Sequence, residues 1–265
     1  MSNSFDWLDP INGYSLRRYY EYENEFDERW RKCQVQYPDR IFDNFSGLEK
    51  LKILDTNKCI EIIDLIDADS PNLRDFYWRV NALSYVFTPE IDARIKAYFR
   101  SNYAPIWCKF YVNRPEGTGG TEPAFSWHQD AGPTKHLKFL IYLNPSEESG
   151  GNTHYINKQE TALFEEIGYS FCPLVRRMRD LSEIADLYKI DFNPIIFDIK
   201  AGEGLLWEPA NILHKGIWPS KGPRYIMQIC ILPSASSWRN ACQEFQLPRE
   251  DNAWPGAKKW TGVNK

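Results

Sequence analysis

The chain has 265 residues, 43% of them hydrophobic and 26% charged, and this balance argues against a disordered polymer. Its 32 Lys and Arg against 36 Asp and Glu give a net charge of −4, which argues against a broad nucleic-acid-binding surface. No apolar run approaches the length of a membrane span, and the N-terminus lacks the basic start and apolar run of a signal peptide. We therefore expect a soluble cytoplasmic protein.

The cysteines indicate the redox compartment. All 6 are scattered without a CxxC pair, at positions 33, 59, 108, 172, 230 and 242. This spacing predicts buried free thiols in a reducing compartment rather than a disulfide framework. No internal repeat or linker is visible, so we predict a single domain over residues 1–265.

Helical patterns dominate the first hundred residues. The predicted elements are, in chain order, a helix over 16–35, a strand over 51–54, a helix that starts at Asp55 or Thr56, and a helix from Thr88 to about Asn102. In the second helix, an apolar face is expected from Cys59, Ile60, Ile62, Ile63 and Ile66. Residues 70–87 mix aromatic and polar types and show no pattern that assigns them.

Strand patterns take over from Ile106. The predicted strands are 106–113, 125–130, 137–143, 153–156, 195–199, 204–208, 213–218 and 224–232. About eight strands with turn punctuation predict a mainly β fold with helical cover, in which two sheets pack as a jelly roll. The charged, helix-favouring stretch 157–194 interrupts this pattern as an insertion. It is either a lid over the substrate or a decoration of the surface.

Two short stretches carry the residues with the most specific chemistry. His128 and Asp130 are two residues apart, so in an extended segment both side chains point to one face. His214 can add a third ligand from a neighbouring strand. Two His and one carboxylate on one side of a metal, with the other side open, is the arrangement of non-heme Fe(II) oxygenases. Ten residues further on, Arg224 offers a planar fork of donors to a dicarboxylate.

This ordered set resembles the Fe(II)/2-oxoglutarate-dependent dioxygenases, and within them the phytanoyl-CoA dioxygenase-like family. Three stretches carry the resemblance: Trp127-His128-Gln129-Asp130, then 141–144 with the Gly-rich turn 149–152, then 201–207 followed by His214. The resemblance spans about residues 105–233. It implies a double-stranded β-helix (jelly roll, cupin-like) with N-terminal helices, and Fe(II), 2-oxoglutarate and O2 as cofactor and cosubstrates.

The resemblance also implies contacts to 2-oxoglutarate. These fall on Arg224, Lys109 and Asn113, and alternation places Lys109 and Asn113 on one face of their strand. Lys138 is a further candidate for the pocket, and the place where relatives carry an aromatic side chain falls on Leu140 or Tyr142. Many relatives have a Ser or Thr beside the Arg, whereas this chain has Gly216 and Ile226, so Arg224 needs a different helper. The two other histidines, His136 and His154, are expected outside the ligand set.

The sequence therefore predicts an Fe(II)/2-oxoglutarate-dependent dioxygenase that hydroxylates a small or medium organic substrate and releases succinate and CO2. Related halogenases carry a small residue in place of the carboxylate ligand, so Asp130 favours hydroxylation over halogenation. Two alternatives stay open. One is a non-catalytic metal-binding β-barrel that acts as a sensor or ligand-binding module. The other is a zinc hydrolase on the same barrel.

Overall fold

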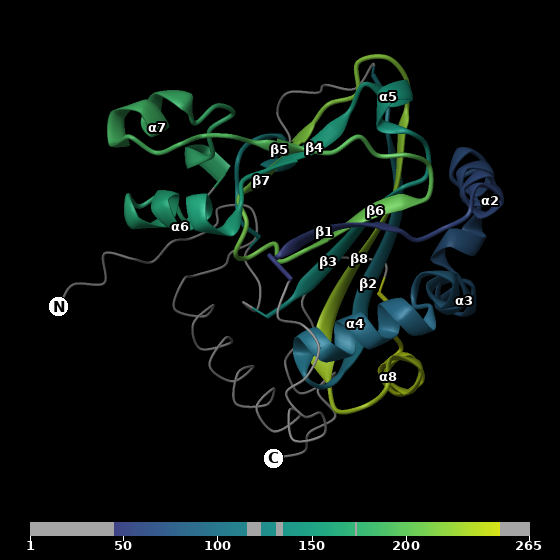
Figure 1. Cartoon of the computed structure of the whole chain (residues 1–265). Helices are drawn as coiled ribbons and strands as arrows, with labels where there is room; N and C mark the ends of the chain where they lie inside the picture. The colour runs from purple at the N-terminus through teal and green to yellow at the C-terminus, as the bar shows by residue number, and fades with distance from the viewer. Residues whose placement is uncertain (1–44, 116–122, 131–134, 173, 250–265) are drawn as a thin grey trace.

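Two antiparallel sheets form the framework of the protein. The computed structural model describes residues 45–115, 123–130, 135–172 and 174–249 (Figure 1). One sheet has 5 strands in the order β1-β6-β3-β8-β2, and the other has 3 in the order β5-β4-β7. The strands are β1 (Leu48–Lys52), β2 (Asn102–Asn113), β3 (Leu137–Tyr142), β4 (Asn152–Tyr155), β5 (Ile195–Ile196), β6 (Glu203–Trp207), β7 (His214–Ile217) and β8 (Arg224–Ser234).

The alternation of β3 divides the large sheet into two faces. Leu137, Phe139 and Ile141 belong to the main hydrophobic core, whereas Lys138 and Leu140 line a cavity on the opposite face. In the sequence, Leu137, Phe139 and Ile141 alternate with Lys138 and Leu140, and this two-residue period predicts the same division. β3 lies between β6 and β8, so its side chains sit at the centre of both faces.

Helices cover the outer face of the large sheet (Figure 1). They are α2 (Thr56–Asp67), α3 (Phe76–Val86), α4 (Pro89–Phe99) and α8 (Trp238–Phe245), with the 3-10 turn η2 (Pro71–Arg74) between the first two. Asp55 accepts from Lys58 N and Thr88 from Ile91 N, which confirms the predicted starts of α2 and α4. Trp238 at the start of α8 is buried in the same core.

Several predicted boundaries are wrong. β2 begins at Asn102 rather than Ile106, because Arg100 adopts a left-handed conformation (φ 52°) that ends α4 early. α3 occupies the stretch that the sequence left unassigned, with Asp75 as its cap. Ile60, expected on the apolar face of α2, is 52% exposed. The predicted helix over 16–35 lies outside the described residues.

The insertion forms a separate lobe beside the small sheet, away from the helices on the large sheet (Figure 1). It contains α6 (Lys158–Glu166), η4 (Leu174–Arg176) and α7 (Ser182–Tyr188), and the short α5 (Ser146–Ser149) lies before it in the chain. Its core includes Phe164 and Leu181 together with Trp127 and Leu213, which neighbour the two histidines of the predicted metal site. None of the described residues of 157–194 is among those that line the cavity between the sheets.

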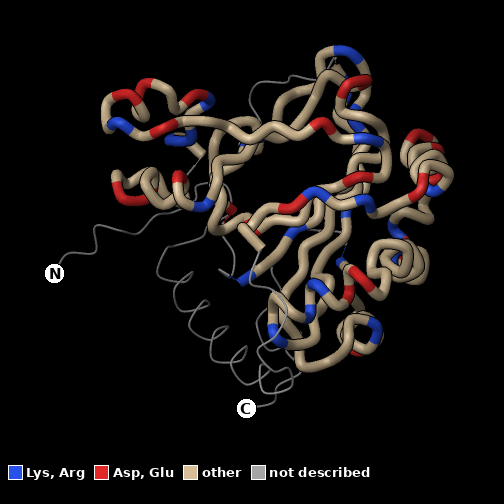
Figure 2. Tube along the Cα trace, in the orientation of Figure 1, with Lys and Arg blue, Asp and Glu red and all other residues tan. Residues whose placement is uncertain are grey.

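The surface and the thiols agree with the composition. Figure 2 shows Lys and Arg interspersed with Asp and Glu along the described chain. None of the described helices is long and apolar enough to cross a membrane. The cysteines in the described ranges are buried and free, as predicted: Cys59, Cys108, Cys172, Cys230 and Cys242.

Gly202 ties the end of β1 to the start of β6, and this generates a stability prediction. Its carbonyl accepts from Ile53 N (2.8 Å) and Leu54 N (2.9 Å), its φ is +77°, and a Cβ there would meet the Leu54 carbonyl. Gly168 has φ +90° but open space around it. We expect Gly202→Ala to lower the free energy of unfolding by roughly 1–3 kcal/mol more than Gly168→Ala, because both variants share the backbone strain and only one clashes. Urea unfolding measures both, and equal losses would contradict the assignment of the clash.

Candidate metal centre

Residues 125–130, which carry His128 and Asp130 and are called the metal segment below, are held from two sides rather than by one partner strand. After the 3-10 turn η3 (Pro123–Phe125) the chain is extended, and His128 forms an isolated antiparallel bridge with His214 at the start of β7. Each backbone N–H of this pair donates to the carbonyl of the other at 3.0 Å. Asp130 N instead donates to Pro209 O at 2.9 Å. The regular strand predicted over 125–130 is therefore reduced to one bridged pair.

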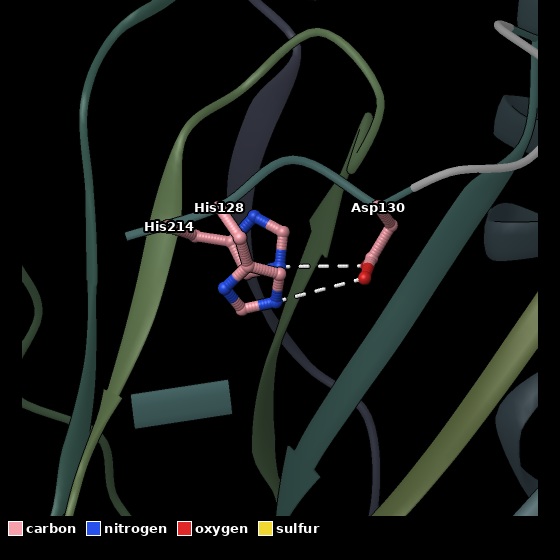
Figure 3. Close-up of side chains that lie close together, drawn as sticks. All are labelled: His128, Asp130 and His214. Carbon is pink, nitrogen blue, oxygen red and sulfur yellow. Dashed lines mark ion pairs between the residues drawn. The ribbon is translucent and has the colours of Figure 1, made fainter. Parts of the chain in front are cut away.

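The bridge brings the predicted ligands together. The ring centroids of His128 and His214 are 4.3 Å apart. Asp130 faces both rings, with Oδ1 3.6 Å from His128 Nε2 and Oδ2 3.4 Å from His214 Nε2 (Figure 3). One ligand atom from each of the three residues lies within 4.8 Å of the others. His136 and His154 are not part of this group, as expected.

Backbone carbonyls fix the orientation of both imidazoles. His128 Nδ1 lies 2.7 Å from Ser126 O, and His214 Nδ1 lies 2.9 Å from Ile212 O. A carbonyl only accepts, so Nδ1 of each ring carries the proton and donates it. The lone pair of each Nε2 is then directed at Asp130 and is available to a metal.

Electrostatics keep His128 and Asp130 in the form that binds a cation. Burial and the neighbouring His214 lower the pKa of His128 well below its usual value, so its ring is neutral at pH 7. Burial alone would raise the pKa of Asp130, but the neighbouring Lys138 ammonium outweighs burial and holds that pKa well below the usual range. The site therefore offers the neutral imidazole of His128 and the ionised carboxylate of Asp130, with the His214 imidazole beside them.

Lys138 from β3 is the direct partner of Asp130. Its Nζ lies 2.6 Å from Asp130 Oδ2 and 5.2 Å from the centroid of the Trp107 ring. The ammonium is buried, and the pair with Asp130 compensates its charge. The sequence placed Lys138 near the pocket but did not predict this pair, because Asp130 lies on a separate segment.

A cavity of about 640 Å³ lies between the two sheets and opens onto the three ligands. It is lined by His128, Asp130 and His214, by Lys138, Leu140 and Arg224 of the large sheet, and by Thr153 and Gly216 of the small sheet. The predicted cosubstrate residues Lys109 and Asn113 also line it, on β2. Asn113 is in register with Arg224 across β2 and β8. All the predicted site residues thus border one space.

Arg224 is buried in the wall of this cavity. Its Nη1 donates to Asn152 O (2.6 Å) and Ile217 O (3.2 Å), which are in β4 and β7. Its Nε is buried without a hydrogen-bond partner in the described ranges. The guanidinium as a whole lines the cavity, where it offers a positive charge to an anion.

Two hydroxyl groups that the sequence did not identify as a pair lie beside Arg224. Tyr142 Oη is 3.1 Å from Thr153 Oγ1, and the Arg224 guanidinium lies 5.8 Å from the Tyr142 ring centroid. Thr153 is in register with Gly216, so it stands opposite the position where relatives carry a Ser or Thr. A Cβ at Gly216 would lie 2.9 Å from the Phe125 ring, so the packing of Phe125 requires glycine there.

The donor set suits a borderline transition metal. Two imidazoles and one carboxylate fit Fe(II) or a catalytic zinc, whereas Ca²⁺ and Mg²⁺ prefer oxygen ligands. The ligands lie on one side and the cavity on the other, so further positions stay open to small molecules. A structural zinc would use four closed ligands and is not matched by these three.

Comparison with known proteins gives likenesses in fold only. No protein-family model and no curated protein matches the chain. A structure of the epimerase SnoN in complex with Fe3+, alpha ketoglutarate and nogalamycin RO matches with a TM-score of 0.49 and 11% identity, over 78% of this chain and 85% of that chain. EctD from S. alaskensis with bound Fe matches at 0.48 and 12%, over 90% and 82%. CytC3 with Fe(II) and alpha-ketoglutarate matches at 0.42 and 12%, over 77% and 79%. TM-scores below 0.5 do not assign an activity to this chain.

The pair of Lys138 and Asp130 predicts a pH-dependent contribution to stability. The pKa of Asp130 is depressed in the folded state, so the pair stabilises the protein above the unfolded-state pKa of about 3.9 and ceases to do so as the pH falls through the folded-state value. We expect Lys138→Met in the metal-free protein to lower the free energy of unfolding at pH 7 by roughly 1–3 kcal/mol. The difference from wild type should shrink as the pH falls through the folded-state pKa of Asp130.

Urea unfolding in the presence of a chelator, repeated over a pH series, measures this difference. Lys200→Met is the matched control, because Lys200 pairs with Asp198 at 2.8 Å on the exposed surface and solvent screens that pair. A deficit of the Lys138 variant that stays constant across the acid range would contradict the ion-pair account.

Proposed function

We propose that the chain is an Fe(II)- and 2-oxoglutarate-dependent dioxygenase that hydroxylates a small or medium organic substrate. The observation that carries this proposal is the meeting of His128, Asp130 and His214 at the wall of a cavity that also contains the buried Arg224. In the overall reaction, substrate, 2-oxoglutarate and O2 are converted to hydroxylated substrate, succinate and CO2.

We further propose that the two sheets form a double-stranded β-helix. The order β6-β3-β8-β2 in the large sheet supports this, as does the order β5-β4-β7 in the small sheet with the His128 segment bridged to β7. From β2 onward the chain passes repeatedly from one sheet to the other. A jelly roll has this connectivity.

In this proposal the chain's own groups hold the reactants. His128 and His214 each offer Nε2, and Asp130 offers one oxygen while Lys138 holds Oδ2. Bound Fe(II) supplies the activation of O2 and the oxidative decarboxylation of 2-oxoglutarate. The open side of the ligand set leaves room for two atoms of 2-oxoglutarate and for O2. The dry core behind His214, formed with Tyr155 and Trp207, excludes water from the rear of the site.

Arg224 lines the cavity, and its guanidinium would bind the distal carboxylate of 2-oxoglutarate there. Thr153 lies in the cavity wall on the strand next to Gly216, and we assign it as the helper hydroxyl. Lys109 and Asn113 border the same cavity and remain candidates for further contacts. A zinc hydrolase would share the ligand set but would not need a cationic side chain in the cavity wall to bind a cosubstrate carboxylate.

The test is an anaerobic absorption spectrum of the protein with Fe(II) and 2-oxoglutarate. We expect a visible metal-to-ligand charge-transfer band that is absent in His128→Ala and weakened in Arg224→Ala. His154→Ala is the matched control and should leave the band unchanged, because His154 is a half-buried histidine of β4 outside the ligand group. A band that survives in His128→Ala would remove the basis of the proposal.

Aerobic turnover separates the alternatives. A dioxygenase releases succinate with Fe(II), and zinc inhibits it by displacing the iron. Hydrolysis supported by zinc would identify a zinc hydrolase instead. Metal binding without succinate release across a broad substrate panel would favour the sensor or ligand-binding module.

Thr153→Val tests the helper assignment separately. The substitution removes the hydroxyl and keeps the shape, so a hydrogen bond to a carboxylate is lost while the fold is retained. We expect the Kd for 2-oxoglutarate to rise about tenfold, which corresponds to one charge-assisted hydrogen bond, and the Kd for Fe(II) to stay unchanged. Titration of the charge-transfer band measures both. A 2-oxoglutarate affinity equal to that of wild type would assign Thr153 to packing alone.

A further inference from the structure

The metal segment has two faces with different partners. His128 and Asp130 point into the cavity, whereas the intervening Gln129 and the preceding Trp127 contact the insertion. We infer that the insertion over 157–194 is a buttress that sets the position of the metal ligands, and that Gln129 is the positioning residue through which it acts. The inference rests on the metal site of the proposed function and adds a role for the insertion.

Gln129 joins three parts of the chain through one amide. The residue is 1% exposed, and its Nε2 donates to Glu165 Oε1 (2.6 Å) at the end of α6 and to Ala210 O (2.7 Å) before β7. Its Oε1 accepts from Ser170 Oγ and Phe171 N, both at 3.3 Å. Two donors and two acceptor sites are the full capacity of a glutamine amide. A saturated buried amide fixes the position of its own backbone, which lies between His128 and Asp130.

The outer edge of the metal segment is also hydrogen-bonded to the insertion. Trp127 N donates to Met178 O (2.8 Å), and Tyr169 Oη donates to Trp127 O (2.8 Å). Tyr169 Oη in turn accepts from Met178 N (2.9 Å). On its inner edge, the next residue, His128, is bridged to His214. The insertion therefore takes the place of a partner strand on this edge.

The insertion also holds the start of β7, the strand that carries the ligand His214. Leu213 N, one residue before His214, donates to Thr161 Oγ1 (3.1 Å) in α6. Leu213 also lies in the core of the insertion with Trp127 and Phe164. Both histidines thus follow a residue that the insertion anchors, so a movement of α6 would move both ligands. A surface decoration would not need contacts to both segments.

A positioning role makes a measurable distinction from a merely structural one. A structural residue changes the free energy of unfolding and leaves the metal site intact in the molecules that remain folded. A positioning residue changes the metal affinity and the ligand geometry of the folded molecules. Loss of a partner in the outer shell of a metal site typically costs 10–100-fold in metal affinity.

The test is a Co(II) titration of Gln129→Leu, read by the visible absorption of the bound metal. We expect a Kd for Co(II) about 10–100-fold above that of wild type and an altered band shape.

Tyr103→Phe is the matched control, because it removes one buried hydrogen bond, to Asp92 (2.9 Å), on the helix-covered side of the large sheet. It should lower stability and leave the Co(II) Kd unchanged. Glu165→Ala removes a single acceptor of Gln129 at an exposed helix position, and a severalfold rise in Kd is expected even if Gln129→Leu does not fold.

A second readout is independent of the metal. In the metal-free protein the His128 Nδ1–H, bonded to Ser126 O, should give a slowly exchanging proton resonance. We expect this signal to be lost or shifted in Glu165→Ala and to persist in Tyr103→Phe. A wild-type protein that binds no Co(II) would contradict the proposed function, and the resonance would still decide the inference. Unchanged Kd and an unchanged resonance in both Gln129→Leu and Glu165→Ala would overturn it.

Discussion

The reciprocal backbone hydrogen bonds between His128 and His214 are the constraint on which the site depends. In an antiparallel pair that exchanges both N–H···O bonds, the two side chains leave the backbone on the same face. This places two imidazoles side by side, and the two-residue period of extended chain adds Asp130 to the same face. The backbone carbonyls two residues before each histidine, those of Ser126 and Ile212, then orient both rings with Nε2 inward. A single bridged pair therefore determines where a metal ligand set can exist.

The remainder of the fold stabilises this pair from opposite directions. The large sheet supplies Lys138, which neutralises Asp130, and Arg224, whose guanidinium borders the same cavity. The insertion holds the outer edge through Trp127 and Gln129. A cationic side chain and a set of metal ligands thus border one cavity, which is what a keto-diacid that chelates a metal would require. The proposed function depends on this combination rather than on either part alone.

Sequence predicted the features that depend on local periodicity. The alternation of β3, the caps at Asp55 and Thr88, and the order of His128, Asp130, His214 and Arg224 are of this kind. α3 has no clean amphipathic stripe, so only its packing on the sheet reveals it. Two other contacts depend on which strands become neighbours, and no single stretch of sequence encodes that. They are the ion pair of Lys138 with Asp130 and the cross-strand pair of Thr153 with Gly216. The insertion was expected as a lid or a decoration because its contacts to Gln129 and Trp127 are long-range.

The most direct test of the central claim is a crystal structure grown anaerobically with Fe(II), with an anomalous difference map recorded at the iron absorption edge. We expect one strong peak at about 2.0–2.2 Å from His128 Nε2, His214 Nε2 and one oxygen of Asp130, at the wall of the cavity. An iron peak elsewhere, or iron bound by only one of these side chains, would contradict it.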